Sequence, residues 1–581
     1  MEMNSIEKQN TVFKKQLGKI DKNSLTDKEN FDFVVLGDIQ FRESFIYEPE
    51  FFSMIEDWNI LKPDMIFIVG DLILGGAAEC VEDQWNICEK TIDRVEPPFI
   101  PLPGGHDIAD EESEKIYERR IGPAKYSLEY GNSRFIALNT EEIGQFPGEL
   151  SKSQMLWLKE TLAKNRSDNI FIMMHQPVFN KELYGNKWDK IAELFKGYPV
   201  RTVFAGHKHY YRDWGIRDGI RYFITGGGGG DRIGVAEEKG AFPHYMLCKV
   251  RGSDVNYAGI KPGAFFAADS ITQLRVGEME NIREAVVTEP VFVPYGECID
   301  RDVNIRVDNP YDWALELDLK WSKLPGWQIT PEIVNISVAP RTKSKTAVHI
   351  KTDNSDAVRY PVPWFETVVD KVKNGGPVKV KNNLNLIHEA YAEYAPSGLN
   401  FDGTLDDWGK AKPMPLIYAC GFDPVKNPED LQAEIRFMWN EDCLYAAVDV
   451  IDNEHNQPYS GDIVWAADNV ELLMGKWHWG LTLTSKGEEV FLYEAPEGRE
   501  IEVVNDIVKL KVTRVTDTHI VYEAAFPASE IVPLELKSGN SFDTAMIMND
   551  LDFTGKRHWL ELTPGWGTFC KGPRVKVILK S

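Results

Sequence analysis

Acidic, amide and histidine residues follow short apolar runs at intervals along the first part of the chain. The runs FDFVVL, DMIFIV, NIFIMM and VRTVFA lead, in chain order, into Asp38 and Gln40, Asp71, His175, and His207 and His209. A further run, PFIPLP, leads into His106 and Asp107. Carboxylate, imidazole and amide ligands together suit divalent ions of the Mn, Fe or Zn class. Two such ions bridged by one carboxylate, about 3.5 Å apart, can bind a phosphoryl oxygen and activate water, as hydrolysis of phosphate esters requires.

These residues can meet if the apolar runs are strands of an open α/β sheet. In such a sheet the carboxyl ends of the strands form the natural crevice, and loops that leave several strands converge there. From residue 31 to about residue 276, apolar runs alternate with segments of helical period such as 51–61, 84–95 and 153–164. This alternation predicts an α/β domain with helices flanking β-sheets.

Each residue taken alone has a more ordinary interpretation. Asp38 or Asp71 could be a carboxylate that caps a loop, and His175 could be a buried, hydrogen-bonded imidazole. The pair His207 and His209 is more specific, because residues i and i+2 project to one side of an extended segment. The ordered set of strand ends, and no single member, carries the metal-site prediction.

The series GDIQ, GDLI, GGHD, MHQP and GHKH resembles the calcineurin-like metallophosphoesterase superfamily over about residues 31–250. The resemblance implies two ion sites that share Asp71, with Asp38, Gln40 and His209 as the other ligands of the first ion and His175 and His207 as those of the second. It also implies that His106 stabilises charge or donates a proton to the leaving group, with Asp107 orienting it. The implied activity is that of a phosphoric ester hydrolase acting on monoesters or diesters.

Two positions depart from the family pattern. Gln40 stands where the family usually has His, although an amide oxygen can still bind a hard cation. Gly105 stands where the family has Asn, whose side chain would supply a ligand to the second ion. The alternative hypothesis is therefore a catalytically weakened or inactive phosphoesterase-like protein that binds carbohydrate or another partner.

The regions on either side of this domain have different patterns. Residues 1–30 are polar and predict an N-terminal tail. Residues 282–372 alternate with period two between turn signals, which predicts a small Ig-like β-sandwich acting as a spacer. A linker at 373–388 leads to a larger β-sandwich at 389–581. The expected fold class is therefore multidomain, an α/β metallophosphoesterase sandwich over 31–276 followed by two all-β sandwich domains.

The last region contains FDGTLDDWGKA and WAADNVE, and over about residues 395–581 it resembles the family-9 carbohydrate-binding modules. The resemblance implies a sugar held between two Trp rings, and calcium that supports the fold. Trp465 is the best-matched ring, with Trp559 or Trp566 as its partner. Core packing of Trp465, and a domain that serves only as a structural lid, remain the alternatives. The calcium ligands could come from Asp452, Asn453 and Glu454, residues that in most loops are only solvated.

Composition limits the partners. The 581 residues include 90 Asp and Glu against 65 Lys and Arg, and the formal charge of −25 repels nucleic acid as a general ligand. We expect neither a membrane span nor a signal peptide, because long apolar runs and an apolar leader are absent from the sequence. The accessory domains favour a secreted or periplasmic protein, and a native N-terminus would favour a cytoplasmic one. The sequence assigns no oligomeric state.

Overall fold

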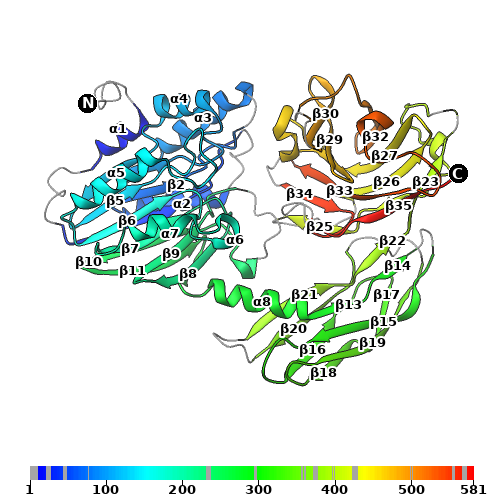
Figure 1. The fold of residues 1–581 in the computed structure, drawn as a ribbon, viewed down its shortest axis with the longest axis horizontal. Helices are drawn as coiled ribbons and strands as arrows, with labels where there is room; N and C mark the ends of the chain where they lie inside the picture. The colour runs from blue at the N-terminus through cyan, green and yellow to red at the C-terminus, as the bar shows by residue number, and fades with distance from the viewer. Residues whose placement is uncertain are drawn as a thin grey trace. The chain divides into compact units, whose positions relative to one another are not determined.

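The computed structural model divides the chain into two compact units, Met1–Gln273 and Leu274–Ser581. It describes residues 11–20, 28–42, 49–75, 78–230, 237–293, 297–354, 358, 361–370, 377–395, 397, 399–421, 429–496, 499, 502–552, 557–565 and 572–581. Figure 1 shows both units and labels most of their helices and strands. Among the described helices, none is long and apolar enough to cross a membrane.

The first unit contains two six-stranded sheets. The first sheet has the order β12-β11-β10-β1-β2-β3. Its strands are β1 (Asn30–Leu36), β2 (Met65–Val69), β3 (Phe99–Leu102), β10 (Tyr245–Arg251), β11 (Asp254–Lys261) and β12 (Ala264–Ala267). Strands β1, β2 and β3 run parallel, so their carboxyl ends lie at one edge of the sheet.

The second sheet has the order β4-β5-β6-β7-β9-β8. Its strands are β4 (Tyr126–Tyr130), β5 (Ser133–Ala137), β6 (Asn169–Met174), β7 (Val200–Ala205), β8 (Tyr211–Arg217) and β9 (Ile220–Thr225). Strands β5, β6, β7 and β9 are parallel neighbours, which again brings their carboxyl ends to one edge.

An aromatic core joins the two sheets face to face. Phe33 and Phe67 of the first sheet meet Phe135 of the second with ring centroids 5.1 and 4.6 Å apart, and Phe33 lies 4.9 Å from Phe171. Side chains alternate along each strand, so the remaining residues of β1, such as Val34, point to the opposite face. Apolar residues on both faces explain why these strands read as continuous apolar runs.

Helices cover the outer faces of the sheets. Helices α2 (Pro49–Leu61), α3 (Ala78–Ile92) and α4 (Glu111–Arg120) pack on the first sheet. On the second sheet, α5 (Lys152–Ala163) and α7 (Lys187–Glu193) contribute buried apolar residues, and the short α6 (Lys181–Tyr184) adds Tyr184. The predicted α/β sandwich with flanking helices is confirmed.

Residues 11–20 differ from the expected polar tail. They contain helix α1 (Val12–Leu17), capped by the Thr11 side chain, which accepts from the backbone N–H of Lys14 at 3.3 Å. The Phe13 ring lies 4.7 Å from that of Tyr126, and the buried Gln16 accepts from the backbone N–H of Phe99 at 3.1 Å. The helix is too short to be stable alone, so these contacts are what hold it.

The second unit begins with helix α8 (Gln273–Ala285), which starts at the last residue of the first unit, and continues as β structure. Two four-stranded sheets follow, with the orders β13-β15-β19-β17 and β18-β16-β20-β21. Their strands are β13 (Val286–Thr288), β15 (Asp300–Asp308), β16 (Leu315–Trp321), β17 (Trp327–Thr330), β18 (Ile333–Val338), β19 (Lys343–Thr352), β20 (Trp364–Val369) and β21 (Val378–Asn383). A separate parallel pair joins β14 (Val291–Val293) to β22 (Leu386–His388).

The C-terminal region is a larger β structure with a main hydrophobic core and a smaller buried cluster around Trp408. Its main path of paired strands is β30-β29-β28-β33-β35-β23-β26-β27-β32-β31, with β24, β25 and β34 attached. The strands are β23 (Ala390–Tyr394), β24 (Met414–Pro415), β25 (Tyr418–Gly421), β26 (Leu431–Trp439), β27 (Cys443–Asp452), β28 (Asn469–Met474), β29 (Trp477–Thr484), β30 (Gly487–Glu494), β31 (Lys509–Thr516), β32 (His519–Pro527), β33 (Ser541–Leu551), β34 (Arg557–Glu561) and β35 (Val575–Leu579). The predicted multidomain fold, an α/β domain followed by β-rich domains, is confirmed.

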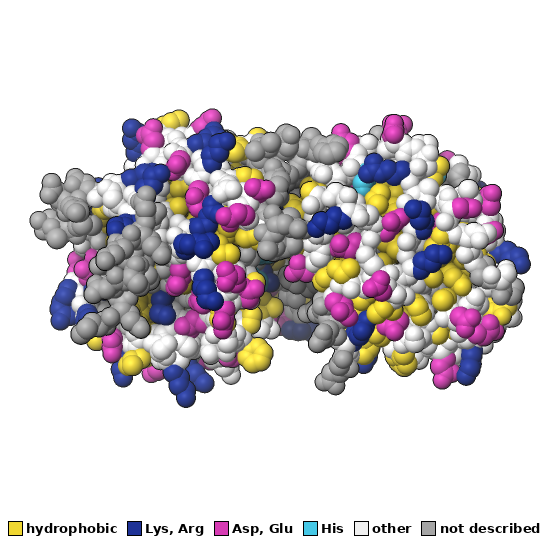
Figure 2. All heavy atoms as spheres, turned by 90° about the horizontal axis from the view of Figure 1, so that it is seen from above, with side chains coloured by type: hydrophobic (Ala, Val, Ile, Leu, Met, Phe, Trp, Pro, Cys, Tyr) yellow, Lys and Arg dark blue, Asp and Glu magenta, His cyan; other side chains and the backbone are white. Residues whose placement is uncertain are grey.

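Charged side chains of both signs share the surface. On the face drawn in Figure 2, the described Lys and Arg side chains lie among Asp and Glu side chains. Acidic and basic side chains are therefore interspersed on this face.

Candidate metal centre

The predicted ligands of the first unit lie at the carboxyl ends of four strands. Asp38 and Gln40 follow β1, Asp71 follows β2, His175 follows β6, and His207 and His209 follow β7. Backbone hydrogen bonds tie neighbouring strand ends together, from Asp38 N to Gly70 O at 2.9 Å and from Gly206 N to His175 O at 3.0 Å. The backbone N–H of His207 donates to Oδ2 of Asp38 at 3.0 Å, which links the second sheet to the first.

Three of these side chains form one compact group. Ligand atoms of Asp38, Asp71 and His175 all lie within 4.8 Å of one another. Nε2 of His175 is 3.3 Å from Oδ1 of Asp71, and Nε2 of His209 is 3.4 Å from Oδ1 of Asp38. The rings of His175 and His207 have centroids 5.2 Å apart. The side chains of Gln40 and His209 lie near each other, because a Cβ placed on Gly230 would be 3.0 Å from Oε1 of Gln40 and 2.8 Å from Cε1 of His209.

Burial leaves two ligand atoms of this group without a hydrogen bond to any described residue. Asp38 and His175 are fully buried, and the two atoms are Oδ1 of Asp38 and Nε2 of His175. Nδ1 of His175 lies 3.0 Å from the carbonyl oxygen of Val69 and donates a hydrogen bond to it when it carries the proton. The lone pair of Nε2 can then bind a metal ion. Buried polar atoms without partners are costly, and a divalent ion would satisfy both. The residues therefore fit the ions that the motifs imply.

The charges of the centre favour cation binding. Burial raises the pKa of Asp71, but His175 and His106 lower it more strongly, to about 2, so Asp71 is ionised at neutral pH. Burial lowers the pKa of His175, and Asp71 and Asp38 raise it to about 9. An ion at Nε2 of His175 would replace the proton there, so metal binding would release protons.

Four of the proposed ligands have left-handed backbone conformations. The φ angles are 61° at Asp38, 55° at Gln40, 54° at Asp71 and 66° at His207. Residues other than glycine rarely adopt such angles, and they cluster at functional sites because surrounding structure must hold them. The backbone strain therefore marks the same turns as the sequence motifs.

The loop with His106 and Asp107 corrects one expectation. Nδ1 of His106 lies 2.6 Å from the carbonyl oxygen of Leu74, and its Nε2 lies 4.0 Å from Oδ2 of Asp71. Asp107 is buried and accepts from the backbone N–H groups of Leu72 at 2.9 Å and of Gly104 at 2.9 Å. The ring of His106 is thus oriented by a backbone carbonyl, and Asp107 instead holds together the two loops that follow β2 and β3.

Sequence motifs missed one residue at this edge of the sheet. Glu141 follows β5 and is only 9% exposed, and its Oε2 lies 3.6 Å from the position that a Cβ on Gly105 would take. The sequence signal that could have found it is the one that marks the predicted ligands, since the run FIAL leads into Asn139, Thr140 and Glu141.

In the C-terminal region, Trp465 lies beside a polar network. This half-buried residue is in the short helix η7 (Gly461–Ala466), and the guanidinium carbon of Arg557 lies 4.8 Å from the centroid of its ring. Arg557 donates to Oδ1 of Asn549 at 2.7 Å, and Asn549 donates to Oε1 of Glu471 at 2.7 Å. An aromatic ring beside amide, carboxylate and guanidinium groups has the composition of a sugar-binding surface.

Trp559 does not offer the second ring that was expected. It is 2% exposed, and its indole N–H donates to Oε1 of Glu561 at 3.0 Å. A ring without a free face cannot stack on a sugar, because its area is already used in core packing. Trp566, the other expected partner, lies outside the described residues.

A second group of candidate ligands lies in the C-terminal region. Ligand atoms of Asp452, His455 and Asp468 are within 4.8 Å of one another, and Nδ1 of His455 is 3.2 Å from Oδ2 of Asp468. Apart from the ion-pair contacts of His455 with Asp468 and Asp452, Oδ2 of Asp452 and Nδ1 of His455 are buried without a hydrogen-bond partner among the described residues. Of the other residues expected to bind calcium, Asn453 uses its amide to donate to Asp430. A histidine among carboxylates suits a transition ion better than calcium, which prefers oxygen ligands.

Two family models match the chain. Residues 31–211 match the family described as calcineurin-like phosphoesterase, and residues 401–562 match the carbohydrate family 9 binding domain-like family. Residues 31–211 of the first unit are therefore similar to the calcineurin-like metallophosphoesterases, a class of phosphoric ester hydrolases, and residues 401–562 are similar to the family-9 carbohydrate-binding domains.

Curated relatives match the first unit. A probable cyclic nucleotide phosphodiesterase of Moraxella catarrhalis is 24% identical over 32% of this chain and 74% of its own length. A cAMP/cGMP dual specificity phosphodiesterase of Mycobacterium tuberculosis is 27% identical over 26% of this chain and 50% of its own length. A probable glycerophosphodiester phosphodiesterase of Arcobacter nitrofigilis is 26% identical over 26% and 57%. The chain thus spans between half and three quarters of these relatives.

Solved structures resemble separate parts of the chain at low scores. A dimetal phosphatase from Danio rerio is 14% identical, with a TM-score of 0.31 over 41% of this chain and 100% of its own. A family 9 carbohydrate-binding module from Caldicellulosiruptor kristjanssonii, in complex with cellotriose, is 14% identical, with a TM-score of 0.26 over 33% and 94%.

Proposed function

We propose that the first unit hydrolyses phosphodiesters with two divalent ions bound between the ends of β1, β2, β6 and β7. The observation that carries the proposal is the pair of buried ligand atoms without hydrogen bonds, Oδ1 of Asp38 and Nε2 of His175, in one group with an ionised Asp71. The choice of diesters is supported by the three curated relatives, each of which is described as a phosphodiesterase.

Each ion would have its own ligands. Asp71 would bridge the two, with Asp38, Gln40 and His209 completing the first set and His175 and His207 the second. When bound, the ions would activate a water and neutralise charge on the phosphoryl group.

His106 is placed to move a proton. Its Nδ1 donates to the carbonyl oxygen of Leu74, which fixes the ring and leaves Nε2 free, and its side chain is 36% exposed. A charged ring would carry a second proton at Nε2 and could give it to the leaving group. Asp107 would act as a positioning residue, because its hydrogen bonds to Leu72 and Gly104 hold the loops that carry Asp71 and His106.

The test of this activity is hydrolysis of bis(4-nitrophenyl) phosphate, with 4-nitrophenyl phosphate as the monoester comparison. We expect the full chain loaded with Mn²⁺ to be active and the metal-stripped chain inactive. Asp71→Asn should lower kcat at least about 100-fold, since it removes the bridging charge. Asp93→Asn, which changes an exposed carboxylate paired with Lys15, should leave kcat unchanged. A full chain that binds Mn²⁺ without any turnover would favour the alternative, a binding protein built on a phosphoesterase fold.

The C-terminal domain would direct the enzyme to a glycan. The proposal rests on the half-buried Trp465 with Arg557, Asn549 and Glu471 beside it. A substrate polymer held by this domain would be at high effective concentration at the centre, with the Ig-like region at 282–372 as a spacer. The secreted or periplasmic location expected from the sequence would bring the protein to such polymers.

A glycan array probed with the full chain tests this second function. Trp465→Ala should abolish binding, whereas Phe292→Ala, which truncates an aromatic residue of β14 that is 56% exposed, should not. Glycan binding that survives Trp465→Ala would remove this surface as the sugar site. Absence of any glycan binding would favour a purely structural role for the domain.

A further inference from the structure

The place where the family motif has an Asn side chain is bordered by a carboxylate. A Cβ built on Gly105 would meet, within 4 Å among described residues outside its immediate neighbours, only Glu141, with Oε2 at 3.6 Å and Cδ at 3.9 Å. The preceding position is different, because a Cβ on Gly104 would lie 2.2 Å from Oδ1 of Asp71. Gly104 therefore borders Asp71, and Gly105 borders Glu141.

The fold brings Glu141 to the second ion's side of the centre. Strand β5 runs parallel to β6, with Ala137 opposite Met173, so the residues after β5 lie beside His175. The turn is anchored there, since the backbone N–H of Gln176 donates to Oγ1 of Thr140 at 3.0 Å.

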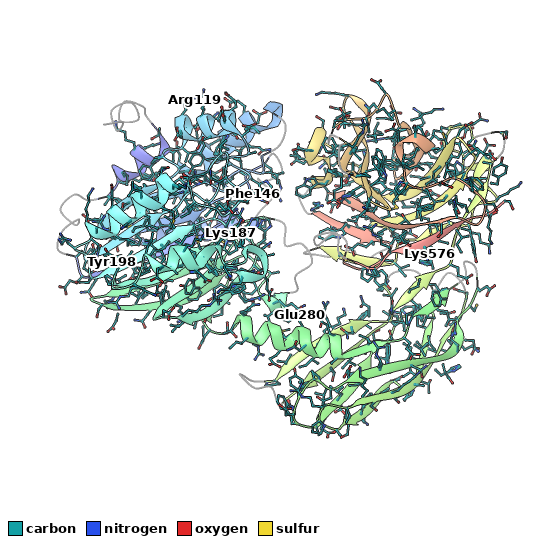
Figure 3. The ribbon with its side chains drawn as sticks, in the orientation of Figure 1. Arg119, Phe146, Lys187, Tyr198, Glu280 and Lys576 are labelled. Carbon is teal, nitrogen blue, oxygen red and sulfur yellow. The ribbon has the colours of Figure 1, made fainter. Side chains whose placement is uncertain are left out.

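The loop beyond Glu141 is also held in place. The backbone N–H of Gly148 donates to the carbonyl oxygen of Thr140 at 2.9 Å, which closes the loop on itself. Further along, Nζ of Lys187 lies 5.8 Å from the ring centroid of Phe146, and both residues are labelled in Figure 3. Glu141 thus has a defined position at the sheet edge.

Glu141 is a buried carboxylate whose two oxygen atoms have different surroundings. Its Oε1 accepts from the hydroxyl of Thr140 at 3.1 Å, whereas Oε2 points toward the space at Gly105. A buried carboxylate is stable only when a cation or several donors compensate its charge.

We infer that Glu141 is a ligand of the second ion, the one assigned to His175 and His207, and that it replaces the Asn side chain absent at Gly105. This inference rests on the proposed two-ion function. It explains how the chain can lose the motif Asn and still complete the second ion site.

The exchange of an amide for a carboxylate also bears on the substrate. Two divalent ions carry four positive charges, and Asp38, Asp71 and Glu141 would carry three negative ones, leaving a net charge of one. With an amide in place of Glu141 the net charge would be two. A weaker positive charge favours the singly charged phosphodiester over the doubly charged monoester, in agreement with the proposed diester activity.

Mn²⁺ binding to the full chain, measured by equilibrium dialysis with metal analysis, tests the inference. Glu141→Ala should keep the first ion and weaken binding of the second at least about tenfold. Gly105→Asn combined with Glu141→Ala should restore the second ion, because Gly105 has no positive φ and the truncated Glu141 leaves room for the amide. In the same double variant, the ratio of the monoester rate to the diester rate should be higher than in wild type.

Glu142→Ala is the matched control. This neighbouring carboxylate accepts from the backbone N–H of Ser151 at 2.7 Å and from its hydroxyl at 2.9 Å, at the start of α5, so its loss should leave Mn²⁺ binding unchanged. Circular dichroism and melting of each variant verify folding. Unchanged binding of two ions in folded Glu141→Ala would overturn the inference alone. If wild type binds no Mn²⁺, or if Asp71→Asn binds Mn²⁺ as well as wild type does, the proposed two-ion function is overturned together with the inference.

Discussion

Replacing Gly104 by alanine would put a methyl group into the metal centre. The added Cβ would lie 2.2 Å from Oδ1 of Asp71, 2.5 Å from the backbone nitrogen of Asp71 and 2.8 Å from Cε1 of His175. Carbon and oxygen atoms do not approach so closely, so the carboxylate and the imidazole must move by about 1 Å to regain normal contact distances. The atoms around the added Cβ belong to the backbone and to two proposed ligands, so none of them is the end of a flexible side chain that could move away.

The size of this displacement sets the expected loss of activity. Metal-ligand distances tolerate changes of about 0.2 Å, and a misplacement of about 1 Å at a reacting centre costs about 100-fold in rate. We therefore expect Gly104→Ala to lower kcat/KM for a phosphodiester about 100-fold and to weaken Mn²⁺ binding. Gly105→Ala makes the same chemical change one residue later, where the added Cβ lies 3.6 Å from Glu141, and should lower kcat/KM less than about threefold.

The assay compares the two variants for hydrolysis of bis(4-nitrophenyl) phosphate and for Mn²⁺ content. Neither glycine has a positive φ, so backbone strain does not separate them. Equal activity of Gly104→Ala and Gly105→Ala, with both folded, would refute the reasoning that Asp71 and His175 must keep these positions for catalysis.

Three further predictions concern stability and the candidate ligands Asp452, His455 and Asp468. Phe33→Ala should lower the unfolding free energy of the first unit by about 3 to 5 kcal/mol in denaturant unfolding, because the fully buried ring touches aromatic rings of both sheets; a loss below about 1 kcal/mol would contradict that packing. Burial lowers the pKa of His388 from 6.5 to about 4, so the unfolded chain binds its proton first as pH falls and the folded state loses stability between pH 6.5 and 4. Between about pH 7 and 5, the unfolding free energy of His388→Phe should therefore fall by about 2 kcal/mol less than that of wild type. An unchanged dependence of the unfolding free energy on pH would show that His388 is not held neutral. Zn²⁺ or Mn²⁺ should raise the melting temperature of the second unit, and Asp468→Asn should abolish the rise; a rise that Ca²⁺ alone produces would contradict the preference for a transition ion.

Sequence reasoning located the candidate ligands of the first unit because their positions follow from chain topology. A buried parallel strand is a continuous apolar run, and the residue after it must lie at the carboxyl edge of the sheet. This is why Asp38, Asp71 and His175, more than thirty residues apart in sequence, could be expected to converge, and the structure places them in one group.

Features that depend on side-chain direction or on weak local signals could not be predicted. Helix α1 has only six residues and is held by contacts such as Phe13 with Tyr126, which a polar composition conceals. The alternating pattern around Trp559 predicts a strand but does not say which face is buried, and the ring proved to be in the core. Asp107 binds backbone N–H groups of two loops, and such bonds leave no trace in residue types. Glu141 follows an apolar run as the predicted ligands do, but it matches none of the family motifs, and its closeness to Gly105 is visible only in the structure.

Anomalous diffraction at the Mn edge, from crystals of the full chain grown with Mn²⁺, tests the central claim most directly. We predict two peaks about 3.5 Å apart, bridged by the carboxylate of Asp71, with Asp38, Gln40 and His209 at one and His175 and His207 at the other. A single peak at Asp71, or none, would contradict the two-ion centre.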